Sequence, residues 1–138
     1  MWWLFALLSA FFAALTSIFA KLGIKDVNTD LATAIRTVVI GILAWGIALF
    51  GNNTMKLSQL TKQNWLFLVL SGIATGLSWI FYFKALQLGK VSQVAPVDKL
   101  SVALAIILAA VFLHENISWK TAIGATLIIA GTFVLVLE

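Results

Sequence analysis

Long apolar runs constrain the fold of this sequence more than any other feature. A helix needs about 20 residues to cross the ~30 Å hydrocarbon core of a membrane, and inside lipid it must satisfy its own backbone hydrogen bonds. Four runs reach that length directly, at residues 2–21, 31–50, 65–85 and 119–137. With a fifth run, they predict an all-α integral membrane protein with five transmembrane helices in a single domain, residues 1–138.

The fifth run is interrupted by charge. Its uncharged stretch, 100–113, is too short to cross alone, so the helix must extend over 92–113. At about 1.5 Å per residue this start places Asp98 and Lys99 roughly 9–10 Å into the membrane. Pro96 removes one backbone hydrogen bond and permits a kink beside them, and a broken helix next to polar residues would place Pro96 on a substrate path. A proline this early can also simply mark a helix start.

Composition excludes several functional classes. Hydrophobic residues make up 62% of the chain and charged residues 10%, and the mean hydropathy is +1.08, so there is too little polar surface to cover a soluble globule. The lysines and the arginine are scattered singly, so a nucleic-acid partner is not expected. The chain has no cysteine and one histidine, His114, and it lacks a phosphate loop or a nucleophile triad. We therefore expect no enzyme activity, no metal and no cofactor.

The embedded charges gather toward one side of the membrane. Arg36 lies early in the second helix, Lys84 at the end of the third, and Asp98 and Lys99 early in the fourth. A charge at the bilayer centre costs about 2.5–3.5 kcal/mol, so these residues are expected to pair or share water in a polar vestibule around a substrate path. Alternatively, Arg36 and Lys84 extend to the headgroups and Asp98 is a structural counter-ion.

The charges also bear on substrate and coupling. More cations than anions are embedded, which favours an anionic or zwitterionic solute. Asp98 is the only deeply embedded acid and is therefore the candidate for proton coupling. A neighbouring Lys or Arg would hold it ionised, and it would then belong to a structural pair.

The third helix carries a polar stripe. Four residues at steps of four, three and four share one face: Ser71, Thr75, Ser78 and Tyr82. They either line the substrate path, together with Trp79, or form hydrogen bonds that hold helices together. Gly72 and Gly76 form a GxxxG pair on an adjacent face, and Gly124 and Gly131 give the last helix small surfaces; we assign all four to close helix packing, within or between chains.

The links between helices are short. Asn28 and Asp30 are candidates to cap the second helix and Ser118 the fifth, while Gly51-Asn52-Asn53 indicates a turn. The lysines of the loops are balanced across the membrane. One side holds Lys56, Lys62 and Lys120, and the other Lys21, Lys25 and Lys90. This tie fits either one topology with a weak signal or a chain that inserts both ways.

A series of short motifs runs through almost the whole chain: Lys21-Leu22-Gly23, Arg36, Tyr82 to Gly89, Val94-Ala95-Pro96-Val97, Leu113 to Ile117, Ile123-Gly124-Ala125 and Ala130-Gly131. In this order they resemble one EamA-type repeat of the drug/metabolite transporter superfamily. Members commonly carry two such repeats in inverted orientation, which form ten helices around a substrate path. The resemblance therefore implies that this chain is one half of a ten-helix inverted-repeat transporter.

Two functions remain open at this point. The first is a homodimeric secondary transporter, antiparallel or parallel, that moves a small polar metabolite by alternating access in a prokaryotic inner membrane. The second is a non-transporting membrane subunit whose small-residue faces bind a partner protein.

Overall fold

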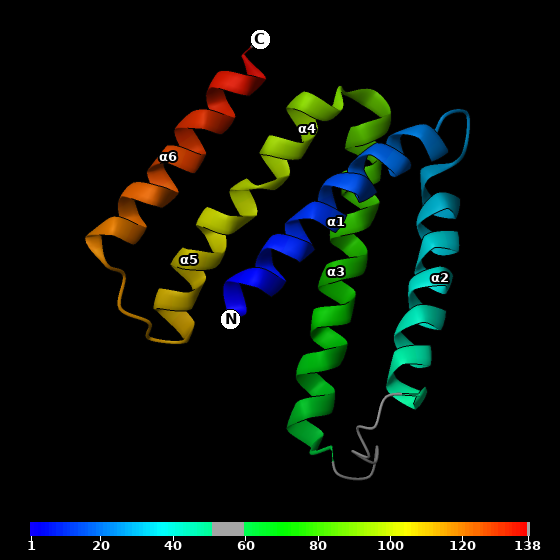
Figure 1. Ribbon diagram of the computed structural model, residues 1–138, viewed down its shortest axis with the longest axis horizontal. Helices are drawn as coiled ribbons and strands as arrows, with labels where there is room; N and C mark the ends of the chain where they lie inside the picture. The colour runs from blue at the N-terminus through cyan, green and yellow to red at the C-terminus, as the bar shows by residue number, and fades with distance from the viewer. Residues whose placement is uncertain (51–59, 138) are drawn as a thin grey trace. The chain divides into compact units, whose positions relative to one another are not determined.

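The computed structural model describes residues 1–50 and 60–137, and all regular structure in these ranges is helical. The helices are α1 (Trp2–Gly23), α2 (Thr29–Phe50), α3 (Lys62–Leu88), α4 (Val91–Asp98), α5 (Leu100–Phe112) and α6 (Trp119–Val136) (Figure 1). α4 and α5 together form one span, so these ranges contain five spans long and apolar enough to cross a membrane. The predicted all-α fold with five such helices is confirmed. Lys56 and the turn expected at 51–53 lie outside the described residues.

Polar side chains begin two of the helices. At α2, Asn28 Oδ1 accepts hydrogen bonds from the backbone N–H groups of Asp30 at 2.8 Å and Leu31 at 3.2 Å. At α6, Ser118 Oγ accepts from the N–H of Thr121 at 3.1 Å. These bonds satisfy N–H groups that have no partner inside the helix. The predicted caps at Asn28 and Ser118 are confirmed, whereas Asp30 lies inside the first turn of α2 and does not cap it.

The fourth span is divided at Lys99. Pro96 has no N–H to donate to the preceding turn, and the N–H of Lys99 is shared between the carbonyls of Ala95 at 3.3 Å and Pro96 at 3.0 Å. The N–H of Val102 donates to the Lys99 carbonyl at 3.0 Å, again only three residues back. Such bonds tighten a helix locally. They separate α4 from α5 directly after Asp98, which is where the sequence permits a kink.

The helices form two compact units. Unit 1 comprises residues 1–19 and 88 onward, and so contains most of α1 together with α4, α5 and α6. Unit 2 comprises residues 20–87, and contains the end of α1 together with α2 and α3.

In unit 1, close backbone approach holds the helices together. α6 packs along both α4 and α5 and runs in the opposite direction to them (Figure 1). Ala103 and Thr132 are only 4% and 5% exposed, and small buried side chains of this kind let helices approach closely. The Thr132 hydroxyl lies 3.2 Å from the carbonyl oxygen of Pro96 and 2.8 Å from that of Ile128. This hydroxyl therefore joins α6 to α4.

In unit 2, long side chains bind the link between α1 and α2 to the end of α3. The buried apolar residues are Ile24, Phe83 and Leu86. Lys21 Nζ donates to the Leu86 carbonyl, and Gln87 Nε2 donates to the Val27 carbonyl at 3.1 Å. The last carbonyls of a helix lack partners within it, so the bond to Leu86 also satisfies the C-terminus of α3.

The outer surface of the spans is apolar. Large side chains from four different helices are mostly exposed: Phe5, Ile42, Phe81 and Leu127. Water would not tolerate apolar patches of this extent on a monomer, whereas lipid tails are as apolar as these side chains. The chain is therefore built as a multi-pass integral membrane protein.

Candidate functional site

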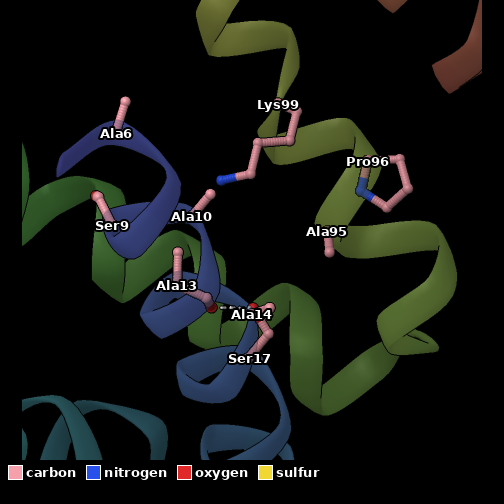
Figure 2. Close-up of a pocket in the computed structure, with 9 residues that line it drawn as sticks. All are labelled: Ala6, Ser9, Ala10, Ala13, Ala14, Ser17, Ala95, Pro96 and Lys99. Carbon is pink, nitrogen blue, oxygen red and sulfur yellow. Dashed lines mark hydrogen bonds between the residues drawn. The ribbon is translucent and has the colours of Figure 1, made fainter. Parts of the chain in front are cut away.

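A groove in unit 1 lies between α1 and the break in the fourth span. Its volume is about 540 Å³. One wall is a row of small residues on α1, namely Ala6, Ser9, Ala10, Ala13, Ala14 and Ser17. The other wall is formed by Ala95, Pro96 and Lys99 (Figure 2). Two of the predicted path residues, Pro96 and Lys99, thus line a real cavity.

The small-residue face of α1 is a feature that our sequence analysis missed. Ala6, Ala10, Ala13 and Ser17 follow one another at steps of four, three and four, so they share one side of the helix. The spacing was visible in the sequence, but between large Leu and Phe residues the segment read only as an apolar span. The Ser17 hydroxyl donates to the Ala13 carbonyl at 3.0 Å (Figure 2).

Lys99 brings charge to this groove. Its side chain extends toward α1 and approaches Ala10 (Figure 2). Its Nζ also lies 3.3 Å from Oδ2 of Asp98, so the two embedded charges compensate each other. Neither side chain is buried, with 56% of Lys99 and 35% of Asp98 exposed, so both remain within reach of a ligand or water. Within residues 1–50 and 60–137, no three side chains of the acidic residues and His114 lie close enough together to hold a metal ion.

A second arrangement of predicted residues lies in unit 2, between α2 and α3. The guanidinium carbon of Arg36 lies 4.3 Å from the ring centroid of Trp79 and 5.2 Å from that of Phe83. An aromatic face attracts a cation at this distance through its quadrupole. Phe83 is 2% exposed, so one wall of this contact is fixed by packing.

The ion pair at the edge of unit 2 shows the register of these two helices. Lys84 Nζ lies 3.7 Å from Asp30 Oδ1, and both side chains are more than half exposed, at 51% and 60%. α2 and α3 run antiparallel (Figure 1), so Arg36, six residues after Asp30, lies level with Trp79, five residues before Lys84. Lys84 thus lies near the helix ends, and Arg36 lies deeper.

Comparisons with known proteins decide what kind of molecule this is. Residues 1–137 match the EamA-like transporter family. The chain belongs to this family. A relative from Sinorhizobium sp, named "Uncharacterized transporter in cobO 3'region", is 46% identical over 134 residues, which are 97% of this chain and 95% of the relative. No solved structure matches the chain. Both names describe a transporter, which is not a kind of enzyme, and the resemblance inferred from the sequence is confirmed.

The predicted path residues of this EamA-like chain fall into two groups. Arg36 and Trp79 meet in unit 2, and Pro96, Asp98 and Lys99 meet in unit 1. The hydroxyl stripe of α3 belongs to unit 2. Ser71, Thr75 and Ser78 are exposed, Tyr82 is half-buried, and Thr75 Oγ1 donates to the Ser71 carbonyl at 2.9 Å. The Thr75 hydroxyl therefore donates to the backbone of its own helix and not to a neighbouring helix.

The four glycines assigned to helix packing have open space beside them. They are Gly72, Gly76, Gly124 and Gly131. A Cβ added at any of them would meet no heavy atom of the described residues within 4 Å. Packing inside the described chain therefore does not require glycine at these positions.

Proposed function

We propose that this EamA-like protein is a secondary transporter that moves a small polar metabolite, anionic or zwitterionic, by alternating access. The proposal is carried by Lys99, which lies at the break of the fourth span and lines a groove that the small residues of α1 keep open. Broken helices beside polar groups are typical of transport sites. The groove, at about 540 Å³, falls within the roughly 300–1,000 Å³ of small-molecule sites.

The pairing of Lys99 with Asp98 suggests how binding and coupling are linked. The Asp98 carboxylate and an anionic solute compete for the same ammonium group, 3.3 Å from Asp98 Oδ2. Protonation of Asp98 removes the competing charge and strengthens the hold of Lys99 on the solute. A proton and an anion therefore enter the groove together, and Asp98 is the coupling residue.

The functional unit in this proposal is a homodimer in a prokaryotic inner membrane. The chain supplies five spans, and the resemblance implies ten around the path. Its Sinorhizobium relative is matched over 95% of its length, so it too has the length of a single repeat. The open faces beside Gly72 and Gly131 can receive helices of a second copy.

A flux assay in proteoliposomes tests the groove. We expect saturable uptake of at least one member of a panel of carboxylates and amino acids, and none of organic cations. Ala10→Phe should block most of this uptake, because Ala10 lines the groove. Ala105→Phe is the matched control, because Ala105 is an exposed residue of α5 outside the groove. Equal flux in both variants would remove the groove from the path.

A second variant tests coupling. Asp98→Asn should leave the solute bound but abolish its accumulation driven by a pH gradient, because the asparagine cannot exchange a proton. Counterflow, which needs no gradient, serves as the control for folding and binding. Proton-driven accumulation that persists in Asp98→Asn would exclude Asp98 from coupling.

Cysteine labelling tests the dimer. The chain has no cysteine, so Ser92→Cys and Asn116→Cys each introduce a single thiol, at the two ends of the fourth span, without changing the charge. Labelling of each site from both sides of the membrane supports an antiparallel homodimer, whereas labelling from one side leaves a parallel dimer. No flux, together with obligate co-purification of another chain, would instead identify a non-transporting subunit.

A further inference from the structure

Arg36 is the only arginine of the chain, and its contacts are unusual for a cation inside a span. Within residues 1–50 and 60–137 its guanidinium contacts the rings of Trp79 and Phe83, and none of its N–H groups forms a hydrogen bond or ion pair. A ring attracts a cation through its face but supplies no lone pair for an N–H donor. The five donors of the guanidinium therefore still require an acceptor.

The depth of Arg36 restricts what that acceptor can be. Arg36 is seven residues past the start of α2 at Thr29, which is about 10 Å along the helix axis. Of its two ring partners, the guanidinium is closer to Trp79, which is the farther from the end of α3. A side chain that extended to the headgroups would instead pass Phe83 toward the Asp30 and Lys84 pair. The guanidinium is thus held inside the span, where an unmet donor is costly.

We propose that Arg36 binds the carboxylate of the transported solute, with Trp79 as the positioning residue that holds the guanidinium. The planar fork of a guanidinium matches the two oxygens of a carboxylate. Lys84 pairs with Asp30 at 3.7 Å, so among the described residues of α2 and α3 Arg36 is the cation inside the span that a carboxylate would meet. This inference rests on the proposed transport function and narrows its substrate to carboxylates, including amino acids.

The sole arginine permits a test on the unmodified protein. Phenylglyoxal reacts with arginine, so mass spectrometry of peptides from the chain, modified in a maltoside detergent, follows the modification of Arg36 apart from that of the N-terminal amine. The probe is acetate, the smallest carboxylate with a carbon side chain, and acetamide is its neutral control at ionic strength matched with chloride. Acetate at about nine times its dissociation constant should slow the modification roughly tenfold by mass action, and acetamide should not slow it.

Three results would overturn the proposal. Equal rates with acetate and acetamide would show that the fork does not select a carboxylate. An Arg36 that phenylglyoxal never modifies would show that no solute reaches it. Protection by phosphatidylglycerol nanodiscs without acetate, with no further effect of acetate, would assign the fork to a lipid phosphate.

Variants separate binding from structure. Arg36→Lys keeps the charge but loses the fork, so uptake of a carboxylate solute should show a rise in KM of about tenfold, the loss expected for one charged hydrogen bond. Trp79→Leu should weaken acetate protection, and Trp79→Phe should restore much of it, because phenylalanine keeps an aromatic face. Trp45→Leu, at an exposed tryptophan of α2, is the matched control. Unchanged protection in Trp79→Leu would remove the positioning role.

The outcome for Arg36 is distinguishable from that for transport itself. Acetate protection without flux of any solute would leave the carboxylate site standing and reject the transporter. Flux that is unaltered in Arg36→Lys would leave the transporter standing and reject Arg36 as the carboxylate site.

Discussion

The two units of this molecule join their helices in different ways. In unit 1, α6 packs closely on α4 and α5, and the buried contacts are a small alanine, Ala103, and the hydroxyl of Thr132 on the Pro96 carbonyl. In unit 2, α2 and α3 are connected by long side chains, through the Lys84 and Asp30 pair and the stack of Arg36 on Trp79.

The two kinds of packing are sensitive to opposite substitutions. Close packing depends on small side chains, so it fails when a residue is enlarged. Contacts between helices that lie farther apart depend on large side chains, so they are lost when a residue is shortened. Each unit also holds a cation within a span. In unit 1 Lys99 lines the groove, and in unit 2 Arg36 lies against its aromatic rings.

The largest expected effect comes from shortening a buried residue of unit 2. Phe83 is 2% exposed and supports the guanidinium of Arg36, so Phe83→Ala should lower the free energy of unfolding by about 3–5 kcal/mol. Phe81→Ala, at an exposed position of the same helix, should cost much less. Unfolding in mixed micelles of increasing dodecyl sulfate content measures both. Equal losses would mean that α3 has no buried side in unit 2.

The opposite change should be the damaging one in unit 1. Ala103 is 4% exposed, so Ala103→Leu should destabilise the protein by about 1–3 kcal/mol through overpacking. Ala105→Leu on the exposed face of α5 provides the comparison and should be close to neutral. The same unfolding assay applies, and a neutral Ala103→Leu would contradict close packing as the basis of unit 1.

A smaller effect is expected from the hydroxyl that joins α6 to α4. Thr132→Val keeps the shape but removes the donor to the Pro96 carbonyl, which should cost about 0.6–1.5 kcal/mol. Thr126→Val is the control on the same helix, because the Thr126 hydroxyl donates to the local Ala122 carbonyl at 2.9 Å. If the two variants have the same stability, the bond between helices contributes nothing beyond a local one.

The smallest effect should be that of the exposed ion pair in unit 2. A double-mutant cycle of Lys84→Gln and Asp30→Asn should give a coupling of about 0.2–1 kcal/mol, because both side chains are more than half exposed. The coupling should fall as salt is raised. A larger, salt-independent coupling would place the pair in a low-dielectric environment. The pair would then not differ from the deeper Arg36 in its exposure to water.

Local features of this protein followed from the sequence. The length of the apolar runs specified five spans, because hydrocarbon thickness and helix rise leave little choice. The caps at Asn28 and Ser118 were also readable, since a side-chain oxygen next to a helix start acts within three residues. Pro96 indicated the place where the fourth span tightens, because its missing N–H is a property of the residue alone.

Other features depended on which helices meet. The pairing of Arg36 with Trp79 joins residues 43 positions apart, and the Thr132 to Pro96 bond joins residues 36 positions apart. The alanine face of α1 became a wall of a groove only because Lys99 lies opposite it. The sequence by itself determined that the chain is an integral membrane protein, where its spans lie and which residues carry charge into them, because these depend on hydrophobicity and local geometry. Only the tertiary structure decided which of those charges pair and which face a cavity, because that depends on the register between helices, which an apolar run does not encode.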